Sequence, residues 1–122
     1  VSTVVGGWVP GSGKHSSVMG SLLVGIHDEA GRLRYCGHVG TGFSDRDRAE
    51  FRRTLEELAV PDSPFAEPVP REFARAAHWA RPVIVAEVEF RQWTTDGRLR
   101  QPSFRGVRDD IAPEDATVRQ RG

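Results

Sequence analysis

The stretch MGSLLVGIHDEAGRLRYCGHV at residues 19–39 decides the fold of this chain. Two apolar runs flank the polar, glycine-containing segment 28–31, which predicts an antiparallel β-hairpin with its turn at that segment. If Asp28 pairs with Gly31, one face of the hairpin carries an apolar set of side chains: Leu22, Val24, Ile26, Leu33 and Tyr35. The other face carries mostly polar residues: His27, Arg32, Arg34, Cys36 and His38. A shift of one residue would mix the two sets, so we expect one core face and one largely polar face.

The segment after this hairpin predicts an amphipathic helix over residues 44–58. Ser44 is a suitable N-cap, and Asp47 stands three residues later, as in a capping box. Three apolar residues then follow with the i, i+4, i+7 spacing of a buried helix face: Phe51, Leu55 and Leu58. Pro61 ends the helix.

Three further segments predict strands, residues 3–9, 82–91 and 99–107, and in the second of them every other residue from Ile84 to Phe90 is expected to face inward. Asp96-Gly97 is a hairpin turn signal between the last two. The proline-rich segment 61–77 connects the helix to these strands, and Phe65 and Phe73 are its expected anchors.

The predicted order is three strands, one helix and two strands. It indicates a mainly β protein, a five-stranded OB-fold (Greek-key) barrel with one helix between strands three and four. We expect the barrel to span residues 1–113 and a polar, frayed tail to span 114–122. The expected interior consists of Leu22, Val24, Ile26, Tyr35, Val39, Ile84, Val88 and Phe90.

The composition of the 122 residues is that of a folded domain, with 38% hydrophobic and 28% charged residues. No apolar run approaches the roughly 20 residues of a membrane helix, and a single cysteine excludes an internal disulfide framework. Basic and acidic residues balance at 17 each, which excludes a globally basic nucleic-acid binder but not a local basic surface. The most basic stretch is 91–108, and nearly all basic residues are arginines.

Several motifs suggest chemistry that their spacing does not support. The run Gly11-Ser12-Gly13-Lys14 lacks the first glycine of a phosphate-binding P-loop, because Trp8 stands there, and His15 replaces its Ser or Thr. Cys36 and His38 lie too far along the hairpin from His27 to share a metal. No metal site is therefore expected. The serines near His15 are interpreted as part of a loop, and the outward pair Glu87 and Glu89 as part of a solvated face.

Seven segments occur in the order that one protein family shows. They are VVGGW (4–8), GSLLVG (20–25), VGTGF (39–43), SPF (63–65), VAEV (85–88), WTTDGRLR (93–100) and PSFRGVRDD (102–110). Over residues 3–113 the chain resembles the C-terminal OB domain of bacterial ATP-dependent DNA ligases, especially the end-joining ligase D group. The family's K-x-D-G lysine nucleophile is absent from this chain. The resemblance therefore implies one domain of a longer ligase, inactive alone.

The resemblance also implies roles for the last of these segments. It is similar to the family's motif VI, R-x-D-K, which orients the triphosphate of ATP; here Ile111 stands in place of the lysine. Arg108 and Asp110 are thus expected to be catalytic, and Arg105 and Arg108 to contact ATP. ATP and Mg²⁺ would be held mainly by an upstream nucleotidyltransferase domain, and this chain alone would hold no cofactor.

The outer sheet face and its basic loops are expected to hold nicked duplex DNA through phosphate contacts. The expected DNA-binding residues are Lys14, Arg32, Arg34, His38, Arg98 and Arg100. By resemblance, further partners are the nucleotidyltransferase domain of the same polypeptide and bacterial Ku. The resemblance also implies a monomer, located in the bacterial cytoplasm at the nucleoid and without membrane contact. Two alternatives remain: a stand-alone OB-fold module that binds nucleic acid, and a purely structural interaction domain.

Overall fold

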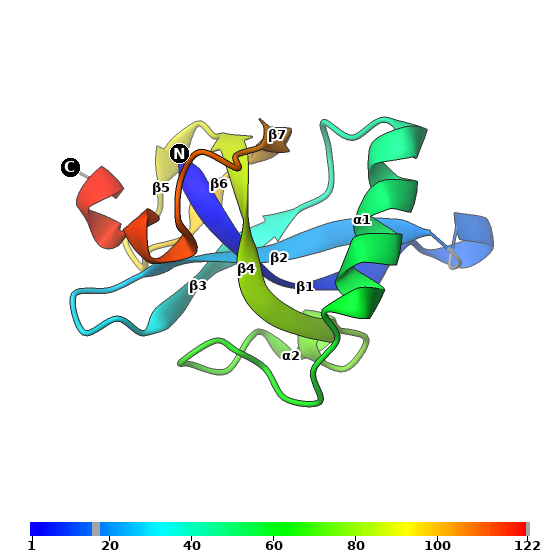
Figure 1. The fold of residues 1–122 in the computed structure, drawn as a ribbon, viewed down its shortest axis with the longest axis horizontal. Helices are drawn as coiled ribbons and strands as arrows, with labels where there is room; N and C mark the ends of the chain where they lie inside the picture. Colours follow the sequence, from blue (N-terminus) through cyan, green and yellow to red (C-terminus); the bar gives the residue numbers. More distant parts are fainter. Residues whose placement is uncertain (16–17, 122) are drawn as a thin grey trace.

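The structure, a computed structural model, describes residues 1–15 and 18–121. Within these residues a curved antiparallel sheet of five strands has the order β3-β2-β1-β4-β7 (Figure 1). Its strands are β1 (Ser2–Pro10), β2 (Met19–His27), β3 (Leu33–Val39), β4 (His78–Glu89) and β7 (Ser103–Val107). The short strands β5 (Gln92–Trp93) and β6 (Leu99–Arg100) form a separate ribbon. The helical elements are α1 (Asp45–Glu57), α2 (Arg71–Ala74) and the 3₁₀ turns η1 (Gly13–His15), η2 (Pro113–Asp115) and η3 (Val118–Arg121).

The two edge strands of the sheet approach each other where β3 ends and β7 begins. The N–H of Phe104 donates to the carbonyl oxygen of Thr41 at 2.9 Å. Gly42 permits this approach, because its φ is +91° and a Cβ there would collide with the backbone of Phe104. The sheet therefore curls into a partly open barrel, and with α1 between β3 and β4 it is an OB-fold, as predicted.

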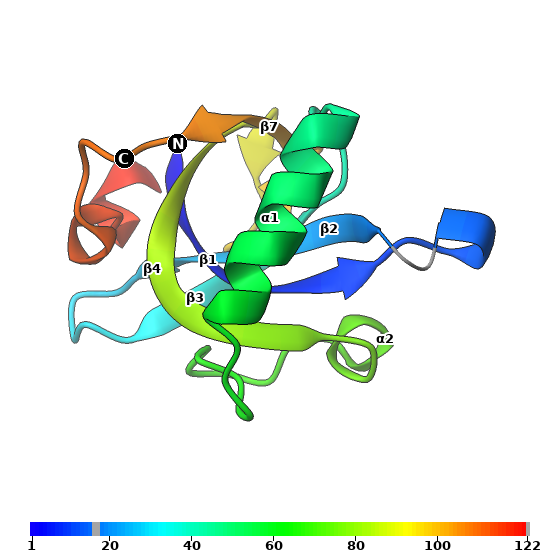
Figure 2. The same cartoon turned by 45° about the vertical axis from the view of Figure 1, so that its right-hand side comes forward.

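Helix α1 packs across the barrel (Figure 2). The predicted capping box is present: Ser44 Oγ accepts from the N–H of Asp47 at 3.0 Å, and the Asp47 carboxylate accepts from the N–H of Ser44 at 2.9 Å. Phe51 and Leu55 are buried on the inner face of the helix, and Leu58 packs beside them as its C-cap residue.

The sheet is buried on both faces, which corrects the expectation of a largely polar outer face. The inner cluster includes Trp8, Leu22, Val24, Ile26, Cys36, Val39, Phe51, Val88 and Phe104. The outer cluster consists of Val4, Leu23, Leu33, Tyr35, Phe65, Val69 and Ala116. Phe65 and Phe73 anchor the connection 61–77 over this outer face, as predicted. Of the expected interior, Tyr35 belongs to the outer cluster, and Ile84 and Phe90 are only partly buried.

The register of the β2–β3 hairpin differs from the prediction by one residue at the turn. The N–H of Asp28 donates to the carbonyl oxygen of Arg32 at 2.9 Å, so the loop has three residues and ends at Gly31, whose φ is +80°. Farther along, Gly25 lies opposite Tyr35 and Val24 opposite Gly37, so Cys36 is the extra residue of a β-bulge. The three-residue loop turns Tyr35 outward, opposite Gly25, and therefore Cys36 inward, where it is buried in the inner cluster; the bulge then places Val39 inward, opposite Leu22.

The last two predicted strands differ in extent. β4 begins at His78, four residues earlier than predicted, because its first two residues pair with β1: His78 lies opposite Trp8 and Trp79 opposite Gly7. The predicted strand 99–107 is divided into β6 and β7 by Gln101, whose φ is +53°.

The tail after Pro113 is packed, so the expectation of a frayed end is wrong. Ala116 is fully buried, and its carbonyl oxygen accepts from the N–H of His27 at 2.8 Å. The side-chain amide of Gln120 donates to and accepts from the backbone of Ser2, both at 2.9 Å. The tail therefore satisfies backbone groups at the start of β1 and the end of β2, beside which Figures 1 and 2 show it.

Candidate functional site

Arg108 is the first residue after β7, and two carboxylates hold its side chain. Its N–H donates to the carbonyl oxygen of Val85 at 2.8 Å. Its guanidinium makes a bidentate contact with Asp110, from Nε to Oδ1 at 3.1 Å and from Nη2 to Oδ2 at 2.9 Å. Nη1 donates to Glu87 Oε1 at 3.3 Å. The structure thus brings together the two residues predicted to be catalytic, Arg108 and Asp110.

The charges of this cluster stabilise one another. Hydrogen bonds to Asp110 and then to Glu87 raise the pKa of the Arg108 guanidinium. The hydrogen bond from Arg108 in turn lowers the pKa of the Asp110 carboxyl. Arg108 therefore remains a cation that its neighbours orient, and its side chain is 36% exposed at the surface.

Glu87 is the member of this cluster that sequence reasoning missed. It lies in β4, opposite Ser2 on β1 and Gly106 on β7. Ser2 Oγ donates to Glu87 Oε1 at 2.8 Å, and the nitrogen of Val1 donates to Oε2 at 2.9 Å. Burial raises the pKa of Glu87, whereas the hydrogen bonds from Ser2 and Arg108 lower it. No local pattern could reveal this role, because Ser2 and Arg108 are 85 and 21 residues away.

Arg105, predicted to contact ATP, lies apart from this cluster. Its guanidinium forms an ion pair with Glu89, and both side chains are exposed, by 59% and 60%. Glu87 and Glu89, interpreted from the sequence as a solvated pair, thus hold two different arginines of the motif VI segment.

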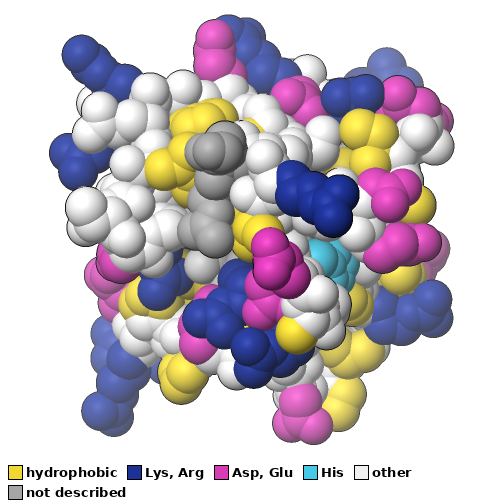
Figure 3. All heavy atoms as spheres, turned by 90° about the vertical axis from the view of Figure 1, so that its left-hand side faces the viewer, with side chains coloured by type: hydrophobic (Ala, Val, Ile, Leu, Met, Phe, Trp, Pro, Cys, Tyr) yellow, Lys and Arg dark blue, Asp and Glu magenta, His cyan; other side chains and the backbone are white. Residues whose placement is uncertain are grey.

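The six residues predicted to bind DNA lie in three separate places. Lys14 is exposed in η1, at the tip of the β1–β2 connection. Arg32 and Arg34 lie beside the β2–β3 turn, each paired with an acid: Arg32 Nε lies 3.3 Å from Asp28, and Arg34 Nη2 lies 2.6 Å from Glu67. Figure 3 shows basic and acidic side chains interleaved on the face that carries this turn, rather than one continuous basic patch.

The third place is an open hollow of about 650 Å³ that His38, Arg98 and Arg100 line together with Phe73. The guanidinium of Arg98 lies 4.5 Å from the ring centroid of Tyr35 and donates to its carbonyl oxygen at 3.2 Å. The ring of His38 lies against Phe73, with centroids 4.2 Å apart, and burial lowers the pKa of His38 while Glu72 opposes the fall. These three predicted DNA contacts therefore share one surface, and Arg98 also lines a smaller hollow together with Arg34.

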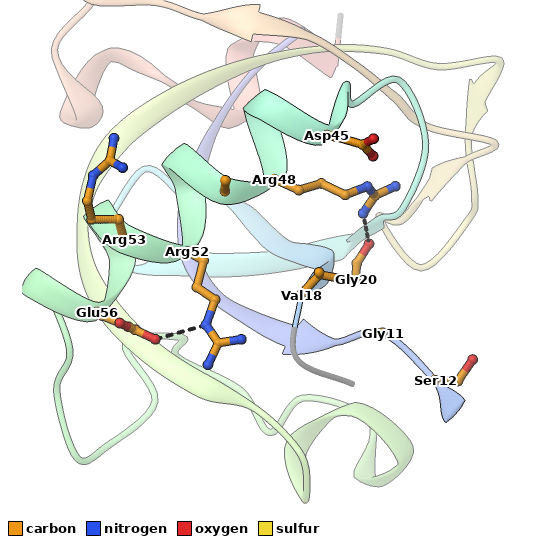
Figure 4. Close-up of a pocket in the computed structure, with 10 residues that line it drawn as sticks. Gly11, Ser12, Val18, Gly20, Asp45, Arg48, Arg52, Arg53 and Glu56 are labelled. Atoms are coloured by element: carbon orange, nitrogen blue, oxygen red, sulfur yellow. Dashed lines mark hydrogen bonds and ion pairs between the residues drawn. The ribbon is translucent and has the colours of Figure 1, made fainter. Parts of the chain in front are cut away.

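A second hollow, of about 710 Å³, separates α1 from the ends of β1 and β2 and is lined by arginines that the sequence analysis did not single out (Figure 4). Arg48 donates to three carbonyl oxygens, those of Met19, Gly20 and Gly40, at 2.8, 2.7 and 3.0 Å. Arg52 pairs with Glu56 at 2.9 Å and lies 5.3 Å from the ring centroid of Trp8. These contacts fix α1 on the barrel, so both arginines are structural.

Other kinds of site find no support among residues 1–15 and 18–121. These residues contain no group of three His, Cys, Asp or Glu side chains that could hold a metal ion. No helix in the same part of the chain is long and apolar enough to cross a membrane. The interpretation of Ser16 and Ser17 as loop residues lies outside the described residues.

The fold, together with the cluster of Arg108, Asp110 and Glu87, defines an OB-fold domain with a charged segment after its last strand. The structure matches the crystal structure of the ligase domain from M. tuberculosis LigD with a TM-score of 0.88 and 43% identity, over 95% of this chain and 37% of that chain. It matches mycobacterial DNA ligase D complexed with ATP and MES with a TM-score of 0.82 and 40% identity, over 95% of this chain and 36% of that one.

Sequence comparison agrees with the structural comparison. The model of the family described as "ATP dependent DNA ligase C terminal region" matches residues 15–111. The multifunctional non-homologous end joining DNA repair protein LigD of Mycobacterium tuberculosis is 45% identical over 112 residues, which are 92% of this chain and 15% of that protein. LigD of Pseudomonas aeruginosa is 39% identical over 109 residues, 88% of this chain and 13% of that protein.

The chain therefore belongs to the family of C-terminal regions of ATP-dependent DNA ligases, in agreement with the resemblance drawn from its motifs. It spans about 13–15% of the length of these LigD relatives.

Proposed function

We propose that this chain is the OB-fold domain of an end-joining DNA ligase and that it supplies Arg108 to the reaction of ATP with the enzyme. In this proposal Arg108 binds the triphosphate of ATP while an upstream nucleotidyltransferase domain of the same polypeptide receives AMP on its lysine. Residues 1–113 would be the OB-fold of this domain, and 114–122 would be its polar C-terminal tail. The observation that carries the proposal is the partly exposed Arg108, held by Asp110 in the Arg-x-Asp segment directly after the last strand.

The chemistry of Arg108 suits this role. A guanidinium binds phosphate oxygens with paired N–H groups, and it stays charged at every physiological pH. An arginine that meets the triphosphate only while pyrophosphate leaves would stabilise that transition state selectively. Asp110 would orient Arg108 rather than take part in proton transfer, because the hydrogen bond from Arg108 keeps its carboxyl ionised. Arg105, paired with Glu89, would be a secondary contact to the same anion.

The test is Arg108→Ala in the full-length protein, with single-turnover measurement of two steps. Transfer of AMP from ATP to the enzyme should slow by about 10²–10³, the usual effect of removing one donor to a developing anion. Sealing of a nick that already carries AMP should slow far less. Arg46→Ala is the matched control, since Arg46 is an exposed arginine paired with Glu50 on α1. Equal losses in both steps would mean that Arg108 serves the fold or the DNA instead.

The position occupied by Ile111 offers a second variant for the same assay. Because the family's motif has lysine there, Ile111→Lys should leave AMP transfer equal or faster. Ile111→Glu should slow AMP transfer, because a negative charge would stand beside the expected path of the triphosphate. Faster transfer with Ile111→Glu would contradict this placement of the triphosphate.

We also propose that the domain holds nicked duplex DNA through its phosphates, without sequence preference, as a ligase that acts at any nick requires. The supporting observation is the shared hollow of His38, Arg98 and Arg100. Lys14, Arg32 and Arg34 would add contacts elsewhere, the last two only after exchanging an acidic partner for phosphate.

DNA binding by this chain should therefore be weak, with a Kd of about 10⁻⁴–10⁻⁶ M, and should weaken as salt rises. Arg100→Ala should lower the salt dependence, whereas Arg46→Ala on α1 should not. Binding that does not change with salt, or that depends on one base sequence, would contradict the proposal. The alternative function, a stand-alone nucleic-acid module, would give the same DNA binding. In that case Arg108→Ala would not change the rate of AMP transfer.

A further inference from the structure

The two carboxylates that hold Arg108 differ in how firmly the fold holds them. Asp110 follows Arg108 by two residues on the same surface segment, and its side chain is 65% exposed. Glu87 lies on β4, paired on one side with β1 and on the other with β7, and its side chain is 34% exposed. Only Glu87 therefore connects the guanidinium to the rigid sheet.

Glu87 is itself held in place by β1. Ser2 is 5% exposed, and its hydroxyl donates to the same oxygen, Oε1, that accepts from Arg108. The backbone of Ser2 is in turn bound on both its N–H and its carbonyl by the side-chain amide of Gln120. A continuous chain of hydrogen bonds thus runs from the C-terminal tail through the start of β1 to Arg108.

The guanidinium keeps free donors within this arrangement. Arginine has five N–H groups, and the contacts with Asp110 and Glu87 use three of them. The remaining two can meet a phosphate while both carboxylates stay in place. Glu87 would then contribute orientation rather than attraction, since its negative charge opposes that of a triphosphate.

We propose that Glu87 is a positioning residue, which fixes the direction in which Arg108 meets the triphosphate during AMP transfer. This inference rests on the proposed role of Arg108. It assigns no contact with ATP to Glu87 itself, because Glu87 acts through the guanidinium. It predicts that loss of the carboxylate reduces the rate of the step more than the binding of ATP.

The test is Glu87→Gln in the full-length protein. The amide keeps the size of the side chain but loses the charge that orients Arg108. AMP transfer at saturating ATP should slow about fivefold, the upper end of the effect of a partly exposed ion pair, while KM for ATP stays equal or falls. In the Arg108→Ala background the same change should slow transfer less than about twofold, because there is no guanidinium left to orient. Glu56→Gln, at the Arg52 ion pair on α1, should have no effect.

A spectroscopic measurement on this chain alone gives an independent readout. The Nε–H signal of Arg108 in a ¹⁵N NMR spectrum should report an ordered side chain, and Glu87→Gln should increase its mobility while leaving the backbone spectrum and the unfolding midpoint nearly unchanged. Glu56→Gln should leave the Arg108 signal as it is. An Arg108 signal that ignores Glu87→Gln would overturn the inference.

The outcomes separate this inference from the function on which it rests. If Arg108→Ala slows AMP transfer but Glu87→Gln does not, the positioning role falls and the proposed function stands. If Glu87→Gln slows transfer as much in the Arg108→Ala background as in the native protein, Glu87 acts by another route and the inference falls. If Arg108→Ala leaves transfer unchanged, both fall together.

Discussion

The ring of Phe65 covers two glycines on the outside of the barrel, and this arrangement allows a sharp test of the packing. Phe65 is 7% exposed and makes edge-to-face contacts with Tyr35 and Trp79, at centroid distances of 5.4 and 6.3 Å. A Cβ added at Gly6 would lie 2.5 Å from Cζ of Phe65. A Cβ added at Gly25 would lie 2.8 Å from Cε1 of the same ring. The Phe65 ring therefore fits against the sheet because Gly6 and Gly25 have no side chains.

Two single variants should each destabilise the domain, for opposite reasons. Phe65→Ala should lower the free energy of unfolding by about 3–5 kcal/mol, because it removes a buried aromatic side chain and leaves a cavity. Gly6→Ala should lower it by about 1–3 kcal/mol, because the added methyl group overlaps the ring. Urea unfolding followed by tryptophan fluorescence measures both.

The double variant decides whether this account is correct. All the atoms that a Cβ at Gly6 would approach most closely belong to the side chains of Phe65 and Pro64. With Phe65 removed, Gly6→Ala should therefore cost less than about 0.5 kcal/mol, so that the two changes are strongly non-additive. Gly25→Ala is the matched control, because its Cβ would also overlap the backbone carbonyl of Arg34, which Phe65→Ala does not move. Additive effects at Gly6, or full relief at Gly25, would refute the reasoning.

Two further predictions concern pH and the attachment of α1. Burial raises the pKa of Tyr35 to about 12, with Arg98 opposing the rise, so the folded state holds the phenol proton more tightly than the unfolded state. The resulting stability should be complete below pH 10 and lost as the pH rises from about 10 to about 12; absorbance at 295 nm reports this directly, because Tyr35 is the chain's one tyrosine, and a midpoint near 10 would contradict it. Arg48→Lys should cost about 2 kcal/mol in urea unfolding, because one ammonium cannot replace three carbonyl contacts, whereas Arg53→Lys on the exposed side of α1 should change stability by less than about 0.5 kcal/mol. Equal effects of the two lysine variants would show that Arg48 does not fasten the helix.

Local sequence was sufficient for most of the elements and for their order. The capping box at Ser44 and Asp47 involves residues three apart, and the alternation of apolar residues in β2 repeats every second residue. Such patterns act within one element, so they could be recognised without knowing the rest of the fold. The order of elements and the short motifs were enough to indicate an OB-fold and the ligase family.

Register and burial depended on contacts that no local pattern contains. The hairpin register and the inward position of Cys36 follow from the three-residue loop closed by Asp28, and the inward position of Val39 follows from a bulge in β3. The outer face is buried because Phe65, 40 residues after Gly25, covers it, and this covering segment is too irregular to be placed by periodicity.

The residues of the candidate site also divide into those identified from the sequence and those found only in the tertiary structure. The motif identified Arg108 and Asp110, which are two residues apart and meet in the structure. Only the tertiary structure added Glu87 and Ser2, because β4 and β1 must pair before their side chains approach the segment after β7. The sequence alone identified Arg108 as the candidate to bind an anion, whereas pairing between distant strands determined how that arginine is held.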